Sequence, residues 1–266
     1  MIGTVPIISI VFMILMAVVI AAIPIILLVY FHKKGADIVP FFVGCAVFLI
    51  FVLILEAIVH RIVILASPAG PVIQGSVVLS AIYGGIMAGL FEEIGRFTAF
   101  KTVLKKFQNK DINAFMYGAG HGGFEAVAIY SLTMITNTVI SFMINSGAID
   151  AITAAVPEEQ LPTLIEQFNT LSTTPFYTFG LGGVERILAM TFHIELSILV
   201  WFAAKNKGKG YLLFLAIFLH AFMDGVTVVM SGSGVNVVLI EAVIAVLVIL
   251  TAFVSRRVWE KNYRAA

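Results

Sequence analysis

The sequence has little charge and almost no cysteine. Of its 266 residues only 12% are Asp, Glu, Lys or Arg, whereas about 25% are charged in a typical soluble domain. With 61% hydrophobic residues and a mean hydropathy of +1.07, the chain has more apolar surface than a water-soluble fold can bury. The sequence therefore predicts an all-α polytopic membrane protein. The single Cys45 excludes an intramolecular disulfide and a metal site built from several cysteines.

Basic residues are absent from the first 31 positions. A secretory signal begins with a basic segment and has a shorter apolar core, so we expect residues 5–31 to remain as the first membrane helix. Seven stretches reach spanning length and predict a seven-helix bundle. These stretches are 5–31, 38–59, 74–100, 112–144, 176–204, 210–231 and 234–256. We expect one integral membrane domain over residues 1–266, with a motif-bearing core at 74–231.

The lysines and arginines predict the orientation of this domain. Most of the 16 basic residues follow the first, third, fifth and seventh stretches. Cytoplasmic segments are enriched in Lys and Arg, so we expect the N-terminus outside and the C-terminus in the cytoplasm. On the opposite side, Arg61 stands alone beside a long acidic loop at 145–175, where a short amphipathic helix is expected between Pro157 and Leu171. The acidic residues of this loop are Asp150, Glu158, Glu159 and Glu166.

The third stretch carries three ionisable residues at bilayer depth, where an unpaired charge costs several kcal/mol. Arg96 is four residues from Glu92 and three from Glu93, so it can pair with either carboxylate on one helix face. A carboxylate held beside an arginine and a second carboxylate is suited to general-base catalysis. The alternative is a structural ion pair that locks the packing of two helices.

The fourth and sixth stretches each place a histidine four residues before a carboxylate. His121 and Glu125 lie in a glycine-rich segment, which allows another helix backbone to approach closely. His220 and Asp224 form the other pair, in which the carboxylate can fix the tautomer of the imidazole. Alternatively, each pair holds helices together without taking part in chemistry.

The fifth stretch contains the remaining histidine. His193 follows Arg186 by seven residues, or two turns along nearly one face, and Glu185 lies beside them. The alternative here is an ion pair between Glu185 and Arg186 with an unrelated histidine.

The predicted depths of these four clusters agree. At 1.5 Å per residue, Glu92 and His193 lie about 26–27 Å from the outer ends of their helices. His121 and His220 lie about 14–15 Å from the cytoplasmic ends of theirs. All four clusters thus fall in the cytoplasmic half of the membrane. We therefore expect one polar chamber, walled by the third to sixth stretches and reached from the cytoplasm.

These residues support the activation of water. No GxSxG motif stands near them and no HExxH motif is present, which argues against the corresponding serine and zinc hydrolases. A glutamate could act as general base while the histidines bind water and stabilise the oxyanion. Alternatively, His121, His193 and His220, with or without a carboxylate, could bind Zn²⁺, which would activate a bound water. The spacing is compatible with both routes.

The four motifs, in their order along the chain, resemble those of the YhfC family of intramembrane proteases. That family belongs to the wider CPBP group, with type II CAAX prenyl endopeptidases and PrsW-type proteases, and the resemblance covers about residues 74–231. The motifs are EExxR at Glu92, Glu93 and Arg96, the glycine-flanked His121, His193, and HxxxD at His220 and Asp224. The resemblance implies hydrolysis of a peptide bond within or beside the membrane. It also implies that one of the two glutamates activates water, that the three histidines bind it or the oxyanion, and that the aspartate orients the last histidine.

Two departures from related patterns narrow the expected substrate. The CAAX enzymes typically show EExxxR, whereas Arg96 comes one residue sooner, and their last motif usually ends in Asn where this chain has Asp224. The PrsW pattern has Lys where Arg96 stands. Neither a prenylated CAAX protein nor an anti-sigma factor is therefore implied. The expected partners are a membrane protein or membrane-associated peptide as substrate and the lipid bilayer, with no nucleic acid and with the oligomeric state left open.

Two other functions would use the same polar residues. A proton- or ion-coupled transporter or channel also needs a polar chamber, but no inverted repeat or broken helix is evident in the sequence. The second is a non-catalytic membrane scaffold or chaperone, like the related scaffold subunit of γ-secretase. That relative has lost the glutamate motif, whereas both glutamates are present here. We therefore favour an intramembrane endopeptidase with a metal-free glutamate mechanism, and Zn²⁺ catalysis is the alternative.

Overall fold

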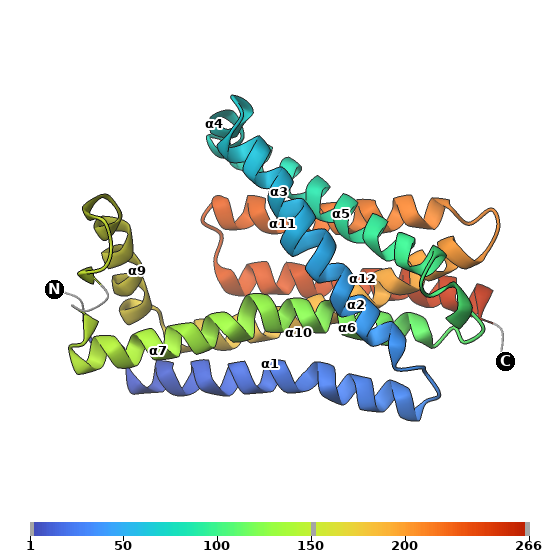
Figure 1. Ribbon diagram of the computed structural model, residues 1–266, viewed down its shortest axis with the longest axis horizontal. Helices are drawn as coiled ribbons and strands as arrows, with labels where there is room; N and C mark the ends of the chain where they lie inside the picture. Colours follow the sequence, from blue (N-terminus) through green and yellow to red (C-terminus); the bar gives the residue numbers. More distant parts are fainter. Residues whose placement is uncertain (1–2, 150–152, 264–266) are drawn as a thin grey trace. The chain divides into compact units, whose positions relative to one another are not determined.

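Residues 3–149 and 153–263 are described by a computed structural model, and within them the chain is helical, without a strand (Figure 1). Seven helical segments of this part are long and apolar enough to cross a membrane. They coincide with the seven predicted stretches, which confirms an all-α, multi-pass membrane protein. The segments are Ile7–Lys33, Val39–Leu65, Val77–Lys101, Asn113–Ser146, Phe176–Lys205, Tyr211–Gly232 and Val237–Asn262. Two residues used in the orientation prediction lie outside the described residues. They are Asp150 of the acidic loop and Arg264 of the basic C-terminal segment.

The chain divides into two compact units. The smaller unit comprises residues 1–22 and 126–186, and the larger comprises 23–125 and 187–266. Two long helices, α1 (Ile7–Lys33) and α10 (Phe176–Lys205), contribute residues to both units. The organisation as a single domain stays a prediction, as does the orientation with the N-terminus outside.

In the smaller unit, a surface helix packs on the membrane helices. This helix is η5 followed by α9, and it confirms the amphipathic helix expected between Pro157 and Leu171. Phe168 and Leu171 are its buried side chains, in a core shared with Met13 and Phe179. The elements wholly within this unit are η4 (Ala126–Ser131), α7 (Leu132–Ser146), η5 (Glu158–Gln160) and α9 (Leu161–Thr173).

The larger unit holds most of the buried side chains. From Leu196 to Phe202, every residue of α10 is buried, and Trp201 donates a 2.8 Å hydrogen bond through Nε1 to Asp111. Lys205 pairs with the same carboxylate, which fixes the end of α10 to the loop before α6. The other elements of this unit are α2 (Val39–Val47), η1 (Phe48–Glu56), α3 (Ala57–His60), η2 (Arg61–Leu65), α4 (Ala69–Gln74), α5 (Val77–Lys101), η3 (Lys105–Phe107), α6 (Asn113–Glu125), α11 (Tyr211–Gly232) and α12 (Val237–Asn262).

The second span is longer than predicted. It runs from α2 to η2 as one continuous helix, with the wider π geometry in η1 and η2. Arg61 therefore lies inside the helix, and the predicted end of this span at residue 59 was wrong. The physical reason is that the residues at 62–65 are Ile, Val, Ile and Leu, so one cation does not end the apolar run.

Glycines allow the helices of the larger unit to touch through their backbones. A Cβ atom at Gly120 of α6 would lie 2.0 Å from the carbonyl oxygen of Phe41 in α2. A Cβ at Gly118 would lie 2.5 Å from Cα of Ile194 in α10, and one at Gly85 of α5 would lie 2.4 Å from the oxygen of Ala221 in α11. These crossings set α5, α6, α10 and α11 at distances that only a missing side chain permits.

Two adjacent glycines of α5 test this packing. We expect Gly85→Ala to lower the free energy of unfolding by about 1–3 kcal/mol because the new methyl group overpacks the contact with α11. Gly84→Ala is the matched control, since a Cβ at Gly84 meets nothing within 4 Å; alanine favours helix there by up to about 1 kcal/mol. Thermal unfolding in detergent measures both variants. Equal stability of the two would contradict the close crossing.

Candidate functional site

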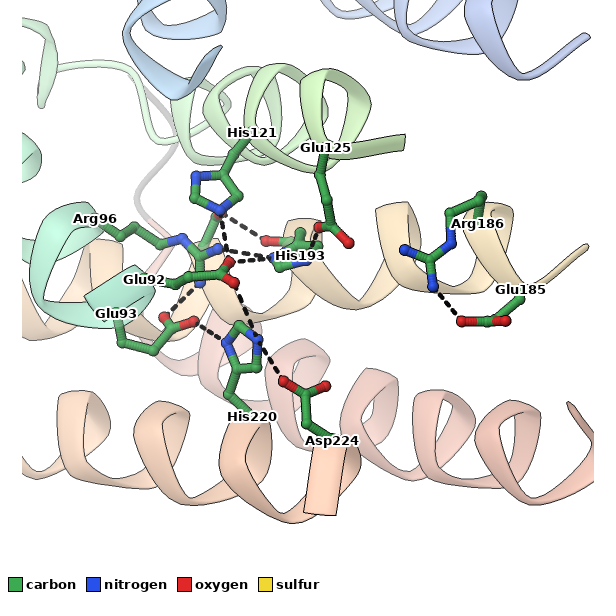
Figure 2. Close-up of polar contacts among 11 residues, drawn as sticks. Glu92, Glu93, Arg96, His121, Glu125, Glu185, Arg186, His193, His220 and Asp224 are labelled. Carbon is green, nitrogen blue, oxygen red and sulfur yellow. Dashed lines mark hydrogen bonds and ion pairs between the residues drawn. The ribbon is translucent and has the colours of Figure 1, made fainter. Parts of the chain in front are cut away.

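Four helices of the larger unit bring ionisable side chains into one buried cluster (Figure 2). Glu93, Arg96 and His121 have no exposed surface, and Glu92 is only 6% exposed. The contributions are Glu92, Glu93 and Arg96 from α5, His121 and Glu125 from α6, His193 from α10, and His220 and Asp224 from α11. The structure thus gathers in one place the predicted site residues other than Glu185 and Arg186.

The imidazoles lie close together because α6 and α10 do. Gly122 of α6 lies against His193, whose Cβ would be 3.0 Å from an added methyl group. The ring centres of His121 and His193 are 5.0 Å apart, and those of His193 and His220 are 5.3 Å apart. A larger residue at Gly122 would therefore push the second imidazole away from the first.

Arg96 is the hub of the hydrogen bonds in the cluster. Its Nη1 forms a short ion pair with Oε2 of Glu93, and its Nη2 donates to Nδ1 of His193 over 3.0 Å. Because that ring nitrogen accepts, the ring proton of His193 is on Nε2, which lies 2.5 Å from Oε2 of Glu125. One guanidinium thus orients a carboxylate and fixes the tautomer of an imidazole. The spacing allowed Arg96 to pair with Glu92 or Glu93, and the structure selects Glu93.

Glu93 has both oxygens engaged. Oε2 faces Arg96, and Oε1 accepts a 2.8 Å hydrogen bond from Nδ1 of His220. With no exposed surface and two charged or polar partners, Glu93 is held as a fixed anion between α5 and α11. It therefore acts on the ring of His220 and leaves no oxygen free for a substrate.

Glu92 is placed differently, in the midst of three imidazoles. Its Oε2 is 2.8 Å from Nε2 of His121 and 3.7 Å from Nδ1 of His193, and its Oε1 is 3.7 Å from Nε2 of His220. The two longer separations exceed hydrogen-bond distance, and they are separations that a small polar molecule can bridge. Glu92 is thus the carboxylate of the cluster whose contacts with two of the imidazoles are longer than a hydrogen bond.

Asp224 and Glu125 contact histidines at the rim of the cluster. Oδ2 of Asp224 is 3.6 Å from Nε2 of His220, so the predicted pair forms an ion-pair contact longer than a hydrogen bond. The side chain of Asp224 is 40% exposed. The i, i+4 spacing put Glu125 beside His121, but its contact is with His193 on the neighbouring helix.

Glu185 and Arg186 form an ion pair with each other (Figure 2). Both belong to the part of α10 that lies in the smaller unit, whereas the cluster is built from the larger unit. Their supporting role in the site stays a prediction.

Aromatic side chains that the sequence reading missed hold the imidazoles in place. Tyr117 is fully buried, one turn before His121, and stacks on that ring with centres 5.9 Å apart. Phe48 meets the same ring edge-on at 5.4 Å, and Phe192 meets His220 at 5.9 Å. The i, i+4 spacing of Tyr117 and His121 was the available signal, but Phe48 lies on another helix and left none.

A metal ion would find donors in this cluster. One ligand atom each from Glu92, His121 and His193 lies within 4.8 Å of the others, a donor set that suits Zn²⁺. The predicted set had His220 in place of Glu92, but His220 is engaged with Glu93. Glu125 supports His193 in the way that outer carboxylates support zinc-bound histidines.

Two features of the same residues oppose a metal ion. Nδ1 of His193 already accepts from Arg96, so a metal there would displace that hydrogen bond and lie beside a guanidinium. Nδ1 of His121 is buried without a hydrogen-bond partner, whereas zinc-bound histidines almost always donate from their second nitrogen. The residues therefore fit zinc by donor type and spacing, provided that Arg96 gives up its contact with His193.

Comparison with known proteins agrees with this architecture. The fold and the cluster define a multi-pass membrane protein with a buried carboxylate–imidazole centre. Residues 19–247 match the YhfC intramembrane metalloprotease family, and the chain belongs to that family. It is 34% identical over 248 residues to the uncharacterized membrane protein YhfC of Bacillus subtilis (strain 168), covering 92% of this chain and 94% of that protein. No solved structure matches the chain.

The buried ion pair between Glu93 and Arg96 predicts that the stability losses caused by substituting these two residues are coupled. Arg96→Gln leaves the Glu93 carboxylate buried without its cation, and we expect it to cost about 3–5 kcal/mol of unfolding free energy. Adding Glu93→Gln should recover part of that loss, because it removes the carboxylate that Arg96→Gln leaves without its cation. Denaturant unfolding in detergent measures the cycle. Arg256→Gln is the control, since Arg256 pairs with Glu260 on an exposed helix end and its loss should change nothing measurable. Additive losses at Arg96 and Glu93 would rule out the coupling.

Proposed function

We propose that this protein is an intramembrane endopeptidase in which Glu92 activates water for attack on a peptide bond. The observation that carries the proposal is the position of Glu92, with a carboxylate oxygen 3.7 Å from each of two imidazoles, His193 and His220. A water molecule placed there would contact the base and the surrounding ring nitrogens together. Membership of a family described as intramembrane metalloproteases supports hydrolysis of peptide bonds.

The proposed reaction uses the residues of the cluster in distinct roles. Glu92 removes a proton from water while the water oxygen bonds to the carbonyl carbon of the substrate. The Nε2–H group of His121 faces Glu92 and stabilises the oxyanion that forms, whereas the N–H groups of His193 and His220 are held by Glu125 and Glu93. Glu92 then gives the proton to the amide nitrogen, the C–N bond breaks, and a carboxylic acid and an amine leave. No step consumes a further reactant.

Glu93 and Arg96 act on the other residues in this proposal. Glu93 is engaged on both oxygens, so it holds His220 in place and does not act as the base. Arg96 fixes His193 with Nδ1 directed inward. Asp224 orients His220 from the rim, and Glu125 supports His193.

The proposed mechanism is free of metal, although the family description names a metalloprotease. Its support is the guanidinium of Arg96 on the ring nitrogen of His193, together with the unsupported ring of His121. If zinc were bound, Glu92, His121 and His193 would hold it, and it would supply a bound water of lowered pKa. We place the family in the wider CPBP group on the strength of its motifs.

The substrate in this proposal is a membrane protein or a membrane-associated peptide. The cluster lies within apolar helices, so a peptide bond that reaches it comes from a segment within or beside the lipid. The cytoplasmic half of the membrane is the proposed depth of the site, from the basic residues that follow alternate spans.

Removing the carboxylate of Glu92 tests the assignment of the base. We expect Glu92→Gln to lower cleavage of a fluorogenic membrane-peptide library by about 100-fold or more, since general-base catalysis contributes about 10²–10⁴. The fold should persist, because glutamine keeps the shape of the side chain. Glu158→Gln, at an exposed position in the loop before α9, is the matched control and should cleave at the wild-type rate. Wild-type cleavage by Glu92→Gln would refute the assignment.

Chelation tests the absence of metal. We expect purified protein treated with a strong chelator to keep its cleavage rate, and elemental analysis to find no stoichiometric zinc. The control is a known zinc protease treated in the same way, which should lose both. Loss of stoichiometric zinc together with activity would replace the glutamate mechanism with zinc catalysis through Glu92, His121 and His193.

A further inference from the structure

A second polar cluster lies in the larger unit, outside the site. The imidazole of His60 bridges two side chains: Nε2 is 3.1 Å from Oε1 of Glu56, and Nδ1 is 2.9 Å from the hydroxyl of Tyr83. Glu56 and His60 lie on the second span and Tyr83 lies on α5, and these two helices run beside each other (Figure 1). No residue of this trio contributes to the proposed reaction.

The trio continues toward the site along the same helices. Phe51 of η1 packs on Gly95, where an added Cβ would lie 2.7 Å from its ring, so η1 is seated on α5 one turn from Glu92. Glu56 follows Phe51 by five residues. On α11, Asp224 lies at the rim of the cluster, with Oδ2 3.6 Å from Nε2 of His220. Polar groups thus lead from Tyr83 through His60 to Glu56 on one side and from Asp224 to the cluster on the other.

The exposure of these groups points to water around them. Glu56 is 5% exposed, and its Oε2 is buried without a hydrogen-bond partner, a state that costs about 1–3 kcal/mol unless water supplies the bond. The side chains of His60 and Asp224 are 38% and 40% exposed, although both lie within spans. A carboxylate that met hydrocarbon over such an area would cost several kcal/mol.

We propose that Glu56, His60, Tyr83 and Asp224 line a water path that joins the cluster to the aqueous phase at the α3–α4 end of the larger unit. Hydrolysis of each peptide bond consumes one water molecule, and this path delivers it. At neutral pH the products are a carboxylate and an ammonium group, so the path needs to carry water and no net proton. The delivery of water for hydrolysis rests on the proposed function, whereas the presence of water in the path does not.

Cysteine accessibility tests the hydration directly. In a Cys45→Ala background, single cysteines replace His60 and Tyr83 and are exposed to a membrane-impermeant, cationic methanethiosulfonate. The thiolate attacks the reagent, which forms a mixed disulfide and releases methanesulfinate, and a thiol ionises readily only where water reaches it. Ile58→Cys and Ile82→Cys are the matched controls on the same two helices. Ile58 and Ile82 are 50% and 53% exposed, and under this proposal their apolar side chains face the lipid.

We expect His60→Cys and Tyr83→Cys to react at least about tenfold faster than the two controls, equivalent to about 1.4 kcal/mol in the barrier. Structural exposure alone predicts the opposite order for His60→Cys and Ile58→Cys, since the isoleucine is the more exposed. Equal or slower labelling of both test positions would overturn the path. Two test positions on two helices protect the result against misfolding of one variant.

The side of access locates the mouth of the path. Lys106→Cys, at the exposed basic turn η3, marks the opposite end of α5. The impermeant reagent labels only the outer side of a sealed vesicle. In vesicles of one orientation, His60→Cys should react and Lys106→Cys should not; in vesicles of the opposite orientation, Lys106→Cys should react and His60→Cys should not. Reaction of both from the same side would overturn the placement of the mouth.

Cleavage by the labelled protein tests delivery of water. Modification of His60→Cys should lower kcat about tenfold relative to the unmodified variant and leave KM unchanged, because water supply limits the reaction and substrate binding is untouched. Labelling without any fall in kcat would contradict the delivery of water through this path. Should Glu92→Gln cleave normally while His60→Cys still labels, the proposed function fails and the hydrated path stands.

Discussion

The guanidinium of Arg96 is the interaction on which the rest of the site depends. Buried without exposed surface, it joins Glu93 on its own helix to His193 on α10. A charge at this depth is stable only when paired, and each partner is in turn fixed by the next helix: Glu93 by His220 of α11, and His193 by Glu125 of α6. Four helices are thus tied through one side chain, and the tautomer of His193 follows from the fact that a guanidinium can only donate.

This arrangement separates two adjacent glutamates into different environments. Glu93 is bonded on both oxygens and cannot move without breaking the ties between helices. Glu92, one residue earlier and about 100° around the helix, faces the three imidazoles instead and keeps wider separations to two of them. The rigidity of one carboxylate therefore preserves the space around the other. Preorganisation of this kind is what a hydrolytic centre within the membrane needs, because no bulk water surrounds it to stabilise a developing charge.

The membrane helices and the gathering of the polar residues could be read from the sequence, whereas the pairing within the cluster could not. Long apolar runs decide the spans by length alone, and the cost of burying Glu92, His121 or His220 unpaired requires them to meet. Which partner each one takes depends on rotamers and on the neighbouring helix: Arg96 reaches Glu93 and Glu92 equally well by spacing, and Glu125 turns to His193 across a glycine contact that no helix periodicity encodes. The end of the second span could have been predicted from the sequence but was not. The apolar residues after Arg61 continue the helix, and the prediction gave more weight to the single cation.

The contact of Gly85 and Gly89 with Ala221 has a consequence for the way a substrate arrives. Added Cβ atoms at these glycines would lie 2.4 Å and 2.8 Å from backbone oxygens of α11, so the two backbones touch and nothing passes between them at these positions. This seam closes the centre to lateral diffusion from the bilayer along that stretch of α5 and α11. Under the proposed function, a substrate segment therefore reaches Glu92 between another pair of helices or from an end of the bundle.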